Sequence, residues 1–334
     1  MGNLQDRSDT VCVIGGGWFG CYAAFRLQQM GIKYTLIESE KELFSGASGN
    51  NQNRLHQGWH YPRSYATRKM SYDGFRKFQH AFPTLSTEVT RNVYCIAEDS
   101  LLDFETYESI FRSEQYDYDI VELQGFRGIN RFGFMVSERM IEVAKSRRFF
   151  SALIRELDLG NRVHSVSDNI VIDQKYGETK YRYVIDCTYG SLKKMEGFIE
   201  QKYLVVCLEP ITAKLSFGAV TVMDGPFFSV FPCAERKYTL TSVMLGPLPE
   251  RNANSGNVDL QKLEHNIFRE ACEYFPKLAE EFTVSGSFIA TKYKSEARSD
   301  RRSTILEIGN KITHVYSGKI DNIFELEKVV VQFK

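Results

Sequence analysis

Hydrophobic residues in the first forty positions follow two different spacings. The β-branched run Thr10–Ile14 predicts a buried strand, and Tyr34–Ile37 predicts a second one. Between them, Cys21–Met30 carries apolar residues at helical spacing, and Gly31 follows as a stop signal. The sequence therefore opens with a strand, a helix and a strand.

Four residues at the ends of these elements predict a dinucleotide site. The first strand runs into a G-x-G-x-x-G motif at Gly15, Gly17 and Gly20, and Glu38 ends the second strand. Gly15 allows a tight turn, Gly17 lets a pyrophosphate approach the backbone, and Gly20 lets the helix pack on the strand. The carboxylate of Glu38 suits ribose hydroxyls and disfavours a 2′-phosphate, so NADP is disfavoured while NAD and FAD stay open.

The rest of the chain predicts two strand-rich insertions in the nucleotide-binding domain that begins with this strand, helix and strand. We expect a nucleotide-binding domain from residues 1–87, 137–199 and 289–334, and a mostly antiparallel substrate domain from residues 88–136 and 200–288. The insertions contain predicted strands at Asn92–Ala97, Tyr118–Leu123, Val220–Met223, Phe227–Phe231 and Tyr238–Met244, a hairpin turn at Asp224-Gly225, and helices at Leu101–Phe111 and Leu260–Phe275.

Residues 44–63 concentrate candidate chemistry. Small residues and amides, able to follow a pyrophosphate and an isoalloxazine edge, lead into His56, His60, Tyr61 and Arg63. His56 is the first candidate for a proton acceptor or substrate-polarising group, because imidazole titrates near neutrality. Tyr61 and Arg63 are candidates for orienting the substrate and binding an anion. The alternatives are a structural histidine, or a polar loop in which the histidines are incidental.

These motifs resemble the FAD-dependent oxidoreductases of the D-amino-acid oxidase type, a family that includes glycine oxidase and glycerol-3-phosphate dehydrogenase. The resemblance rests on the glycine motif, on Ser48 and Asn51, and on the run His56, Gly58 and Tyr61. It implies an α/β fold with a Rossmann-like FAD-binding domain of the GR2 type. It also implies a helix at Ser137–Leu153, a strand and turn at Tyr183–Gly190, and a closing strand pair and turn within Arg301–Lys319. The FAD contacts that it implies are Gly15, Gly17, Gly20, Glu38, Ser48, Asn51, Arg54, Leu55, Gly190, Ser317, Gly318 and Lys319.

The C-terminal residues support a flavin contact on physical grounds. Lys311–Tyr316 alternates as a strand, a Ser-Gly-Lys turn follows, and Asp321 can cap a helix whose apolar face includes Ile323 and Val330. The turn could place backbone N–H groups and Lys319 against the negative charge of a reduced flavin. The alternative for Lys319 is a solvated surface lysine.

Two further groups have weaker signals. The aromatic residues Phe228, Phe231 and Tyr238 are possible pocket walls, although aromatic residues on strands are more often core. An arginine of the basic run Arg298–Arg302 could bind a substrate carboxylate.

Composition limits the classes of molecule that the protein can bind. The 334 residues carry 42 basic and 42 acidic side chains, which argues against nucleic acid or an anionic membrane as the main partner. Every long apolar stretch is too short to span a bilayer, so we expect a soluble cytoplasmic protein. Seven cysteines without a CxxC spacing predict reduced core residues and no metal site. The last of them, Cys272, stands far before the C-terminal turn, so we expect the FAD to be non-covalent.

The sequence thus predicts an FAD enzyme that removes a hydride from a CH–NH or CH–OH carbon of a small, polar and anionic substrate. It does not identify the electron acceptor. One alternative is a flavin monooxygenase using NAD(P)H, which would usually carry an Asp-Gly motif where Cys187-Thr188-Tyr189-Gly190 stands. The other is a catalytically silent nucleotide-binding scaffold.

Overall fold

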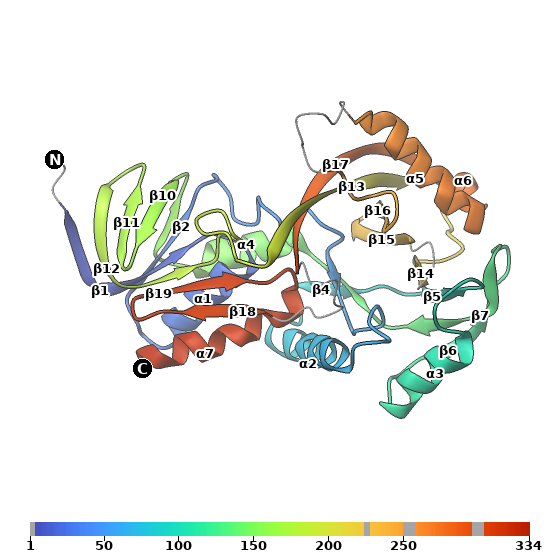
Figure 1. Ribbon diagram of the computed structural model, residues 1–334, viewed down its shortest axis with the longest axis horizontal. Helices are drawn as coiled ribbons and strands as arrows, with labels where there is room; N and C mark the ends of the chain where they lie inside the picture. Colours follow the sequence, from blue (N-terminus) through green and yellow to red (C-terminus); the bar gives the residue numbers. More distant parts are fainter. Residues whose placement is uncertain (1–3, 224–227, 250–257, 296–303) are drawn as a thin grey trace.

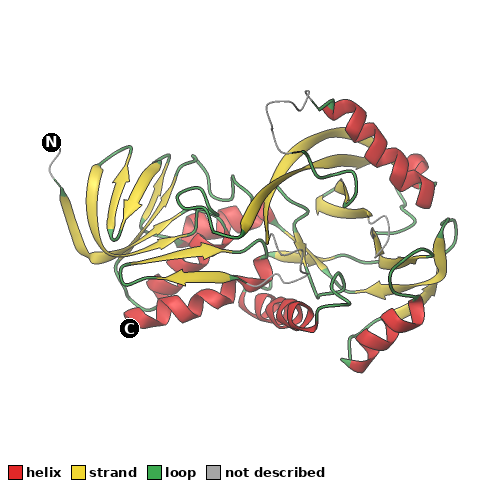
Figure 2. Cartoon of the chain, in the orientation of Figure 1, coloured by secondary structure: helices red, strands yellow, loops and turns green. Residues whose placement is uncertain are grey.

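The computed structural model describes residues 4–223, 228–249, 258–295 and 304–334. Within these ranges the chain forms two large sheets, one toward each end of the molecule, with helices packed against both (Figures 1 and 2). A third, small sheet pairs β8 (Arg139–Ile141) with β3 (Arg54–Leu55) and β4 (Ser86–Glu88). No helix in the described part of the chain is long and apolar enough to cross a membrane.

The first sheet has a parallel centre in the order β9-β2-β1-β12-β19. Antiparallel strands extend it, because β10 and β11 form a meander with β12 and because β18 pairs with β19. The bounds are β1 (Gln5–Ile14), β2 (Tyr34–Glu38), β9 (Leu157–Leu159), β10 (Val163–Ser167), β11 (Ile170–Asp173), β12 (Gly177–Asp186), β18 (Ile305–Ile308) and β19 (Ile312–Tyr316).

Alternating residues of β1 supply the two faces of this sheet. Val11 and Val13 face a core shared with the helices, whereas Cys12 and Ile14 face a smaller core shared with β11 and β12. The helices on the first face are α1 (Trp18–Gln29), α2 (Tyr65–Ala81), α4 (Val143–Leu153) and the C-terminal run η1 (Ile320–Leu326), α7 (Glu327–Val330) and η2 (Val331–Phe333). The predicted strand, helix and strand at the start of the chain are confirmed.

The second sheet has the order β17-β13-β16-β15-β14-β5-β7-β6, and all its pairs are antiparallel except β14 with β5. Helices α5 and α6 cover one face, and α3 covers the other. The bounds are β5 (Asn92–Ala97), β6 (Asp119–Glu122), β7 (Ile129–Val136), β13 (Phe198–Pro210), β14 (Ala219–Met223), β15 (Phe228–Ala234), β16 (Lys237–Ser242), β17 (Phe282–Ser295), α3 (Phe104–Ser113), α5 (Leu260–Tyr274) and α6 (Leu278–Glu281).

The mostly antiparallel second sheet agrees with the sequence. Two of its helices begin where an aspartate accepts a backbone N–H: Asp103 caps α3, and Asp259 caps α5. The predicted turn Asp224-Gly225 lies outside the described residues. The division of the chain into two domains at residues 88, 137, 200 and 289 stays a prediction.

Two local predictions are wrong. The segment Ser137–Leu153 is not one helix, because Met140 and Ile141 are buried as strand β8 before α4 begins. Asp321 does not cap a helix; it lies inside the 3-10 helix η1 and forms an ion pair with Lys319. Gly74 of α2 allows η1 to pack this closely, because a Cβ there would lie 2.1 Å from the Asp321 carbonyl oxygen.

Candidate active site

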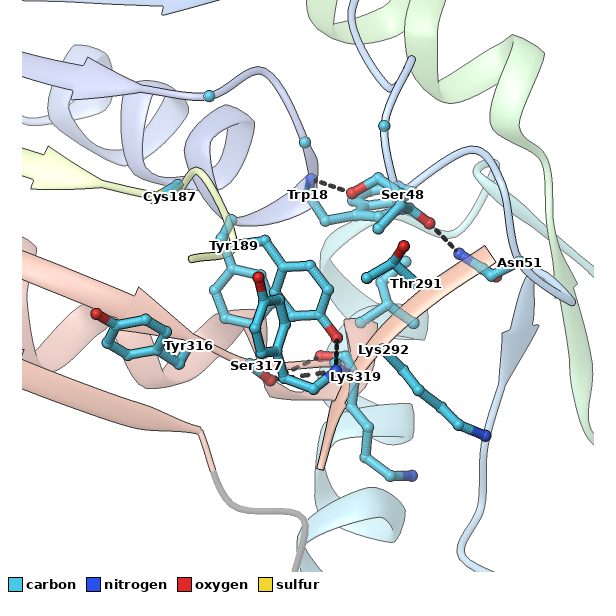
Figure 3. Close-up of a pocket in the computed structure, with 18 of the residues that line it drawn as sticks. Trp18, Ser48, Asn51, Cys187, Tyr189, Thr291, Lys292, Tyr316, Ser317 and Lys319 are labelled. Atoms are coloured by element: carbon cyan, nitrogen blue, oxygen red, sulfur yellow. Dashed lines mark hydrogen bonds between the residues drawn. The ribbon is translucent and has the colours of Figure 1, made fainter. Parts of the chain in front are cut away.

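A cavity of about 1620 Å³ extends from the carboxyl ends of β1, β2 and β12 to the second sheet. In open α/β sheets, ligands bind at this edge of the parallel strands. The loop at residues 45–54 and the C-terminal turn at residues 317–320 form parts of its wall, and β17 contributes the wall on the side of the second sheet. Figure 3 shows these segments converging on one space.

The glycine motif lies at one end of this cavity, where the backbone packs too closely for side chains. Gly15 has a φ of 101°, and a Cβ there would lie 2.8 Å from the Cys187 carbonyl oxygen. A Cβ on Gly20 would lie 1.8 Å from the Gly15 carbonyl oxygen. Gly17 precedes α1 and has no side chain to cap it, so the N-terminus of the helix lies at this end of the cavity, where only the Trp18 N–H has a side-chain acceptor among the described residues, Ser48 Oγ. This cradle fits a pyrophosphate.

Glu38 completes the nucleotide end. Its Oε2 accepts the Gly16 N–H at 2.5 Å, and its Oε1 accepts the Glu40 N–H at 2.8 Å. These bonds fix the carboxylate in the cavity wall at the end of β2, where its remaining lone pairs can accept ribose hydroxyls. The glycine cradle and the Glu38 carboxylate together therefore fit the ADP half of FAD.

The structure brings most of the predicted site residues into this one cavity. The predicted residues that line it are Gly15, Gly17, Glu38, Ser48, Asn51, Arg54, His56, Tyr61, Arg63, Ser317, Gly318 and Lys319. Three predicted cofactor contacts do not line it. Gly20 packs α1 against the Gly15 carbonyl, Leu55 is fully buried in the core, and Gly190 packs against the ring of Tyr293.

Ser48 and Asn51 shape the loop beside the cradle. Ser48 Oγ accepts the Trp18 N–H at 3.1 Å, which ties the loop to the first turn of α1. Asn51 donates to the Ala47 carbonyl at 2.6 Å and accepts the Asn53 N–H at 2.5 Å. These contacts hold the loop in a fixed path along the cavity.

His56 and His60 lie together in the cavity wall. Their rings meet edge to face with centroids 4.6 Å apart. Burial lowers the pKa of both histidines well below the usual range, and the nearby charges of Lys319 and Arg54 lower it further. Both imidazoles are therefore neutral near pH 7.

Lys319 is buried, which excludes the alternative of a solvated surface lysine. Its Nζ donates to Ser71 Oγ at 3.1 Å, lies 3.7 Å from Asp321 Oδ2 and sits 4.4 Å from the centroid of the Tyr61 ring. Burial alone would lower the pKa of Lys319, but the Asp321 carboxylate and Tyr61 outweigh it and raise that pKa. The ammonium group is a fixed positive charge in the cavity wall.

Strands β13 and β17 supply the wall on the side of the second sheet. The Nζ of Lys292 lies 4.3 Å from the centroid of the Tyr203 ring, and the hydroxyl of Tyr189 accepts the Tyr293 N–H at 3.2 Å. Sequence reasoning missed Lys292, Tyr203 and Tyr293, because a lysine or tyrosine on an alternating strand carries no signal of which face meets a cavity.

The aromatic residues proposed as pocket walls are core residues instead. Phe228 and Phe231 are fully buried, and Tyr238 packs against the core under α5. None of the three lines the cavity. The basic run Arg298–Arg302 lies outside the described residues.

Arg54 lies in the cavity wall, but its guanidinium group turns into a buried network. It donates to Tyr94 Oη at 2.9 Å and to Ser229 Oγ at 2.7 Å, and it stacks 3.8 Å from the centroid of the Phe231 ring. It also lies 3.5 Å from the carboxylate of Glu138, which is fully buried. Tyr94 and Glu138 were not predicted from the sequence.

His56, His60 and Glu138 place one possible metal ligand each within 4.8 Å of one another. The carboxylate of Glu138 already accepts the Gln57 N–H at 2.9 Å and the Tyr94 hydroxyl at 2.8 Å, and it faces the positive charge of Arg54. These groups compete with a cation. The prediction that the protein holds no metal stays a prediction.

Comparison with known proteins decides the family. Residues 10–301 match the model of the FAD dependent oxidoreductase family (DAO). The chain belongs to this family. It is 34% identical to the FAD-dependent monooxygenase FPY4 of Fusarium mangiferae over 345 residues, which cover 97% of this chain and 92% of the relative. It is 25% identical to the FAD-dependent monooxygenase kojA of Aspergillus flavus, with coverage of 96% and 84%.

Solved structures with the same fold include oxidases. Glycine oxidase from Geobacillus kaustophilus superposes with a TM-score of 0.73 at 11% identity, covering 98% of this chain and 94% of that one. The L-alpha-glycerophosphate oxidase of Mycoplasma pneumoniae, with FAD bound, gives a TM-score of 0.69 at 14% identity, with coverage of 99% and 95%. The predicted fold class, the family and FAD as the cofactor are confirmed. The protein is an FAD-dependent oxidoreductase, so the alternative of a catalytically silent scaffold no longer stands.

Proposed function

We propose that this FAD enzyme removes a hydride from a carbon that bears an amine or hydroxyl group, in a small, polar and anionic substrate. The observation that carries the proposal is the pair of neutral imidazoles, His56 and His60, in the same cavity as the glycine cradle. A neutral imidazole can take the proton that an N–H or O–H group loses when its carbon loses a hydride. FAD, when bound, accepts that hydride.

Cationic side chains support an anionic substrate. Arg63 and Lys292 line the cavity that holds the two histidines, and Lys319 adds a buried positive charge. The two acidic residues of the cavity wall, Glu38 and Glu40, lie instead at the nucleotide end. A substrate carboxylate or phosphate would therefore find its favourable potential at the end away from the cradle.

The predicted site residues then take separate roles. His56 polarises the substrate or accepts its proton, Tyr61 orients it, and Arg63 binds its anionic group. The Tyr61 ring already packs on the Lys319 ammonium group, which fixes its position. Because an anion contact acts mainly on the ground state, Arg63→Ala should raise the substrate concentration needed for saturation more than it lowers the maximal rate.

Anaerobic mixing with a panel of amino and hydroxy acids tests the proposal. We expect at least one acid to bleach the flavin absorbance, and the matching amide or ester to bleach it only at much higher concentration. Equal bleaching by the acid and its uncharged analogue would contradict the anionic substrate. Failure of every member to bleach the flavin would contradict the hydride removal.

A second candidate is oxygen insertion driven by NAD(P)H. It is favoured by the relative of 34% identity, which is named a monooxygenase. The same anaerobic experiment separates the two candidates. Bleaching by NADH or NADPH, with none by the acids, would support the monooxygenase.

A further inference from the structure

A buried polar network stands directly behind His60. Tyr94 of β5 is fully buried, Glu138 precedes β8, and the guanidinium of Arg54 on β3 contacts strands β5, β14 and β15 of the second sheet. The Tyr94 hydroxyl lies 2.8 Å from Nδ1 of His60 and joins this network to a histidine of the cavity wall. Such a network sets the proton positions of the groups that it contacts.

The hydrogen bonds of Tyr94 can be assigned proton by proton. A phenol has one proton and two lone pairs. The Arg54 guanidinium can only donate, and its Nη1 takes one lone pair at 2.9 Å. The phenol proton goes to Glu138 Oε2 at 2.8 Å. The second lone pair of Tyr94 therefore faces His60 Nδ1, and this nitrogen must carry the proton.

The charge of Glu138 supports this direction. Its Oε1 accepts the Gln57 N–H at 2.9 Å, and Arg54 Nη1 lies 3.5 Å from its Oε2. Burial raises the pKa of Glu138, and the Arg54 guanidinium, the Gln57 N–H and the Tyr94 hydroxyl act against that rise. A donor on each oxygen and a guanidinium 3.5 Å away favour the ionised carboxylate, which can only accept. The Tyr94 hydroxyl therefore donates its proton to Glu138 and not to the imidazole of His60.

The same network does not fix His56. Its Nδ1 lies 3.8 Å from Glu138 Oε1, which is beyond hydrogen-bond distance. The two histidines of the cavity wall therefore differ, since only His60 has a proton position set by the residues behind it.

We propose that His60 Nε2 is the proton acceptor of the reaction and that Tyr94, held by Glu138 and Arg54, is the positioning residue that sets this tautomer. The inference rests on the proposed function. The O–H or N–H bond of the substrate breaks, its proton forms a new bond to Nε2, and the C–H electron pair leaves as the hydride that reduces FAD. His56 then polarises or orients the substrate.

Nuclear magnetic resonance of the FAD-loaded enzyme with isotope-labelled histidine tests the tautomer without any substrate. The His60 signals are identified by their loss in His60→Gln. We expect the Nδ1–H form in the wild type, and a shift of its population toward the Nε2–H form in Tyr94→Phe, which keeps the ring and its packing on Trp59. An Nε2–H form in the wild type would overturn the proposal.

Anaerobic flavin bleaching tests the role in the reaction. We expect His60→Gln to bleach about 100-fold to 10,000-fold more slowly at saturating substrate while its FAD content stays normal. Tyr94→Phe should lower the rate and change its pH profile, whereas His80→Gln, on the exposed end of α2, should match the wild type. A His60→Gln variant that bleaches at the wild-type rate would overturn this inference alone, because the wild type would still bleach as the proposed function requires.

Discussion

Gly17 and Ser48 lie so close that a Cβ on Gly17 would come within 2.6 Å of Ser48 Oγ. That hydroxyl is itself fixed by the Trp18 N–H at the start of α1. Gly17→Leu should therefore displace the loop and fill the pyrophosphate space, and the purified variant should lose its FAD. The absorbance ratio of flavin to protein measures the loss.

Gly31→Leu is the matched control at the other end of α1. A Cβ there meets no atom within 4 Å, although its φ of 69° strains any other residue. We expect a stability cost of about 1–2 kcal/mol with a normal FAD content. Equal loss of FAD in both variants would show that helix stability, and not the cradle, controls FAD binding.

The FAD should be bound without a covalent bond. Of the seven cysteines, all of which are free, Cys187 is the one in the cavity wall. Burial raises the pKa of its thiol well above the usual range, and the Asp186 carboxylate adds to the effect, so it is a poor nucleophile. Acid precipitation should release the yellow colour into the supernatant. Colour retained in the pellet would point to a bond through a histidine of the cavity wall.

Removal of the Arg54 charge should destabilise the protein. Arg54→Met leaves the carboxylate of Glu138 buried without its cation, which typically costs about 3–5 kcal/mol of unfolding free energy. The double variant Arg54→Met, Glu138→Gln should lose less unfolding free energy than Arg54→Met alone, because it buries no unpaired carboxylate. Arg131→Met is the control, because its salt bridge to Glu122 is exposed and should be worth about 0–1 kcal/mol. Urea unfolding of the FAD-loaded proteins measures all three, and an Arg54→Met variant as stable as Arg131→Met would contradict the buried network.

The neutral histidines predict a pH dependence of stability. In the unfolded chain His56 and His60 take up protons near pH 6.5, whereas in the folded protein their lowered pKa delays this uptake. The unfolded state then binds more protons below pH 6.5, so the unfolding free energy should decrease as the pH is lowered below 6.5, by up to about 1.4 kcal/mol per pH unit for each histidine. The slope should be shallower in His60→Gln than in the wild type, and identical slopes would contradict the burial of its neutral ring.

The nucleotide end was predictable because its signals are local. The glycine motif and Glu38 lie at the junctions of a strand, a helix and a strand, and each residue type has a steric or electrostatic reason at its position. The loop at residues 44–63 was predictable for a similar reason, since its small and polar residues are adjacent in the chain.

The network behind His60 was not predictable, because its members come from distant segments. Tyr94 reads as one more apolar position of β5, and Glu138 stood in a stretch interpreted as the start of a helix. Pairing of β8 with β3 brings Glu138 toward Arg54, and no single segment carries that register. The sequence indicated Lys319 as a positive charge near the flavin, but it did not indicate the ion pair with Asp321, which was interpreted as a helix cap.

Flavin reduction by a substrate deuterated at the reacting carbon tests the central claim most directly. The measurement uses the most effective acid of the panel, without oxygen and without NAD(P)H, and compares the rate of bleaching with that of the unlabelled acid. If the enzyme removes a hydride from that carbon, the acid alone should bleach the flavin and deuterium should slow the bleaching. Bleaching that requires NAD(P)H, or that proceeds at the same rate with the deuterated acid, would contradict the account.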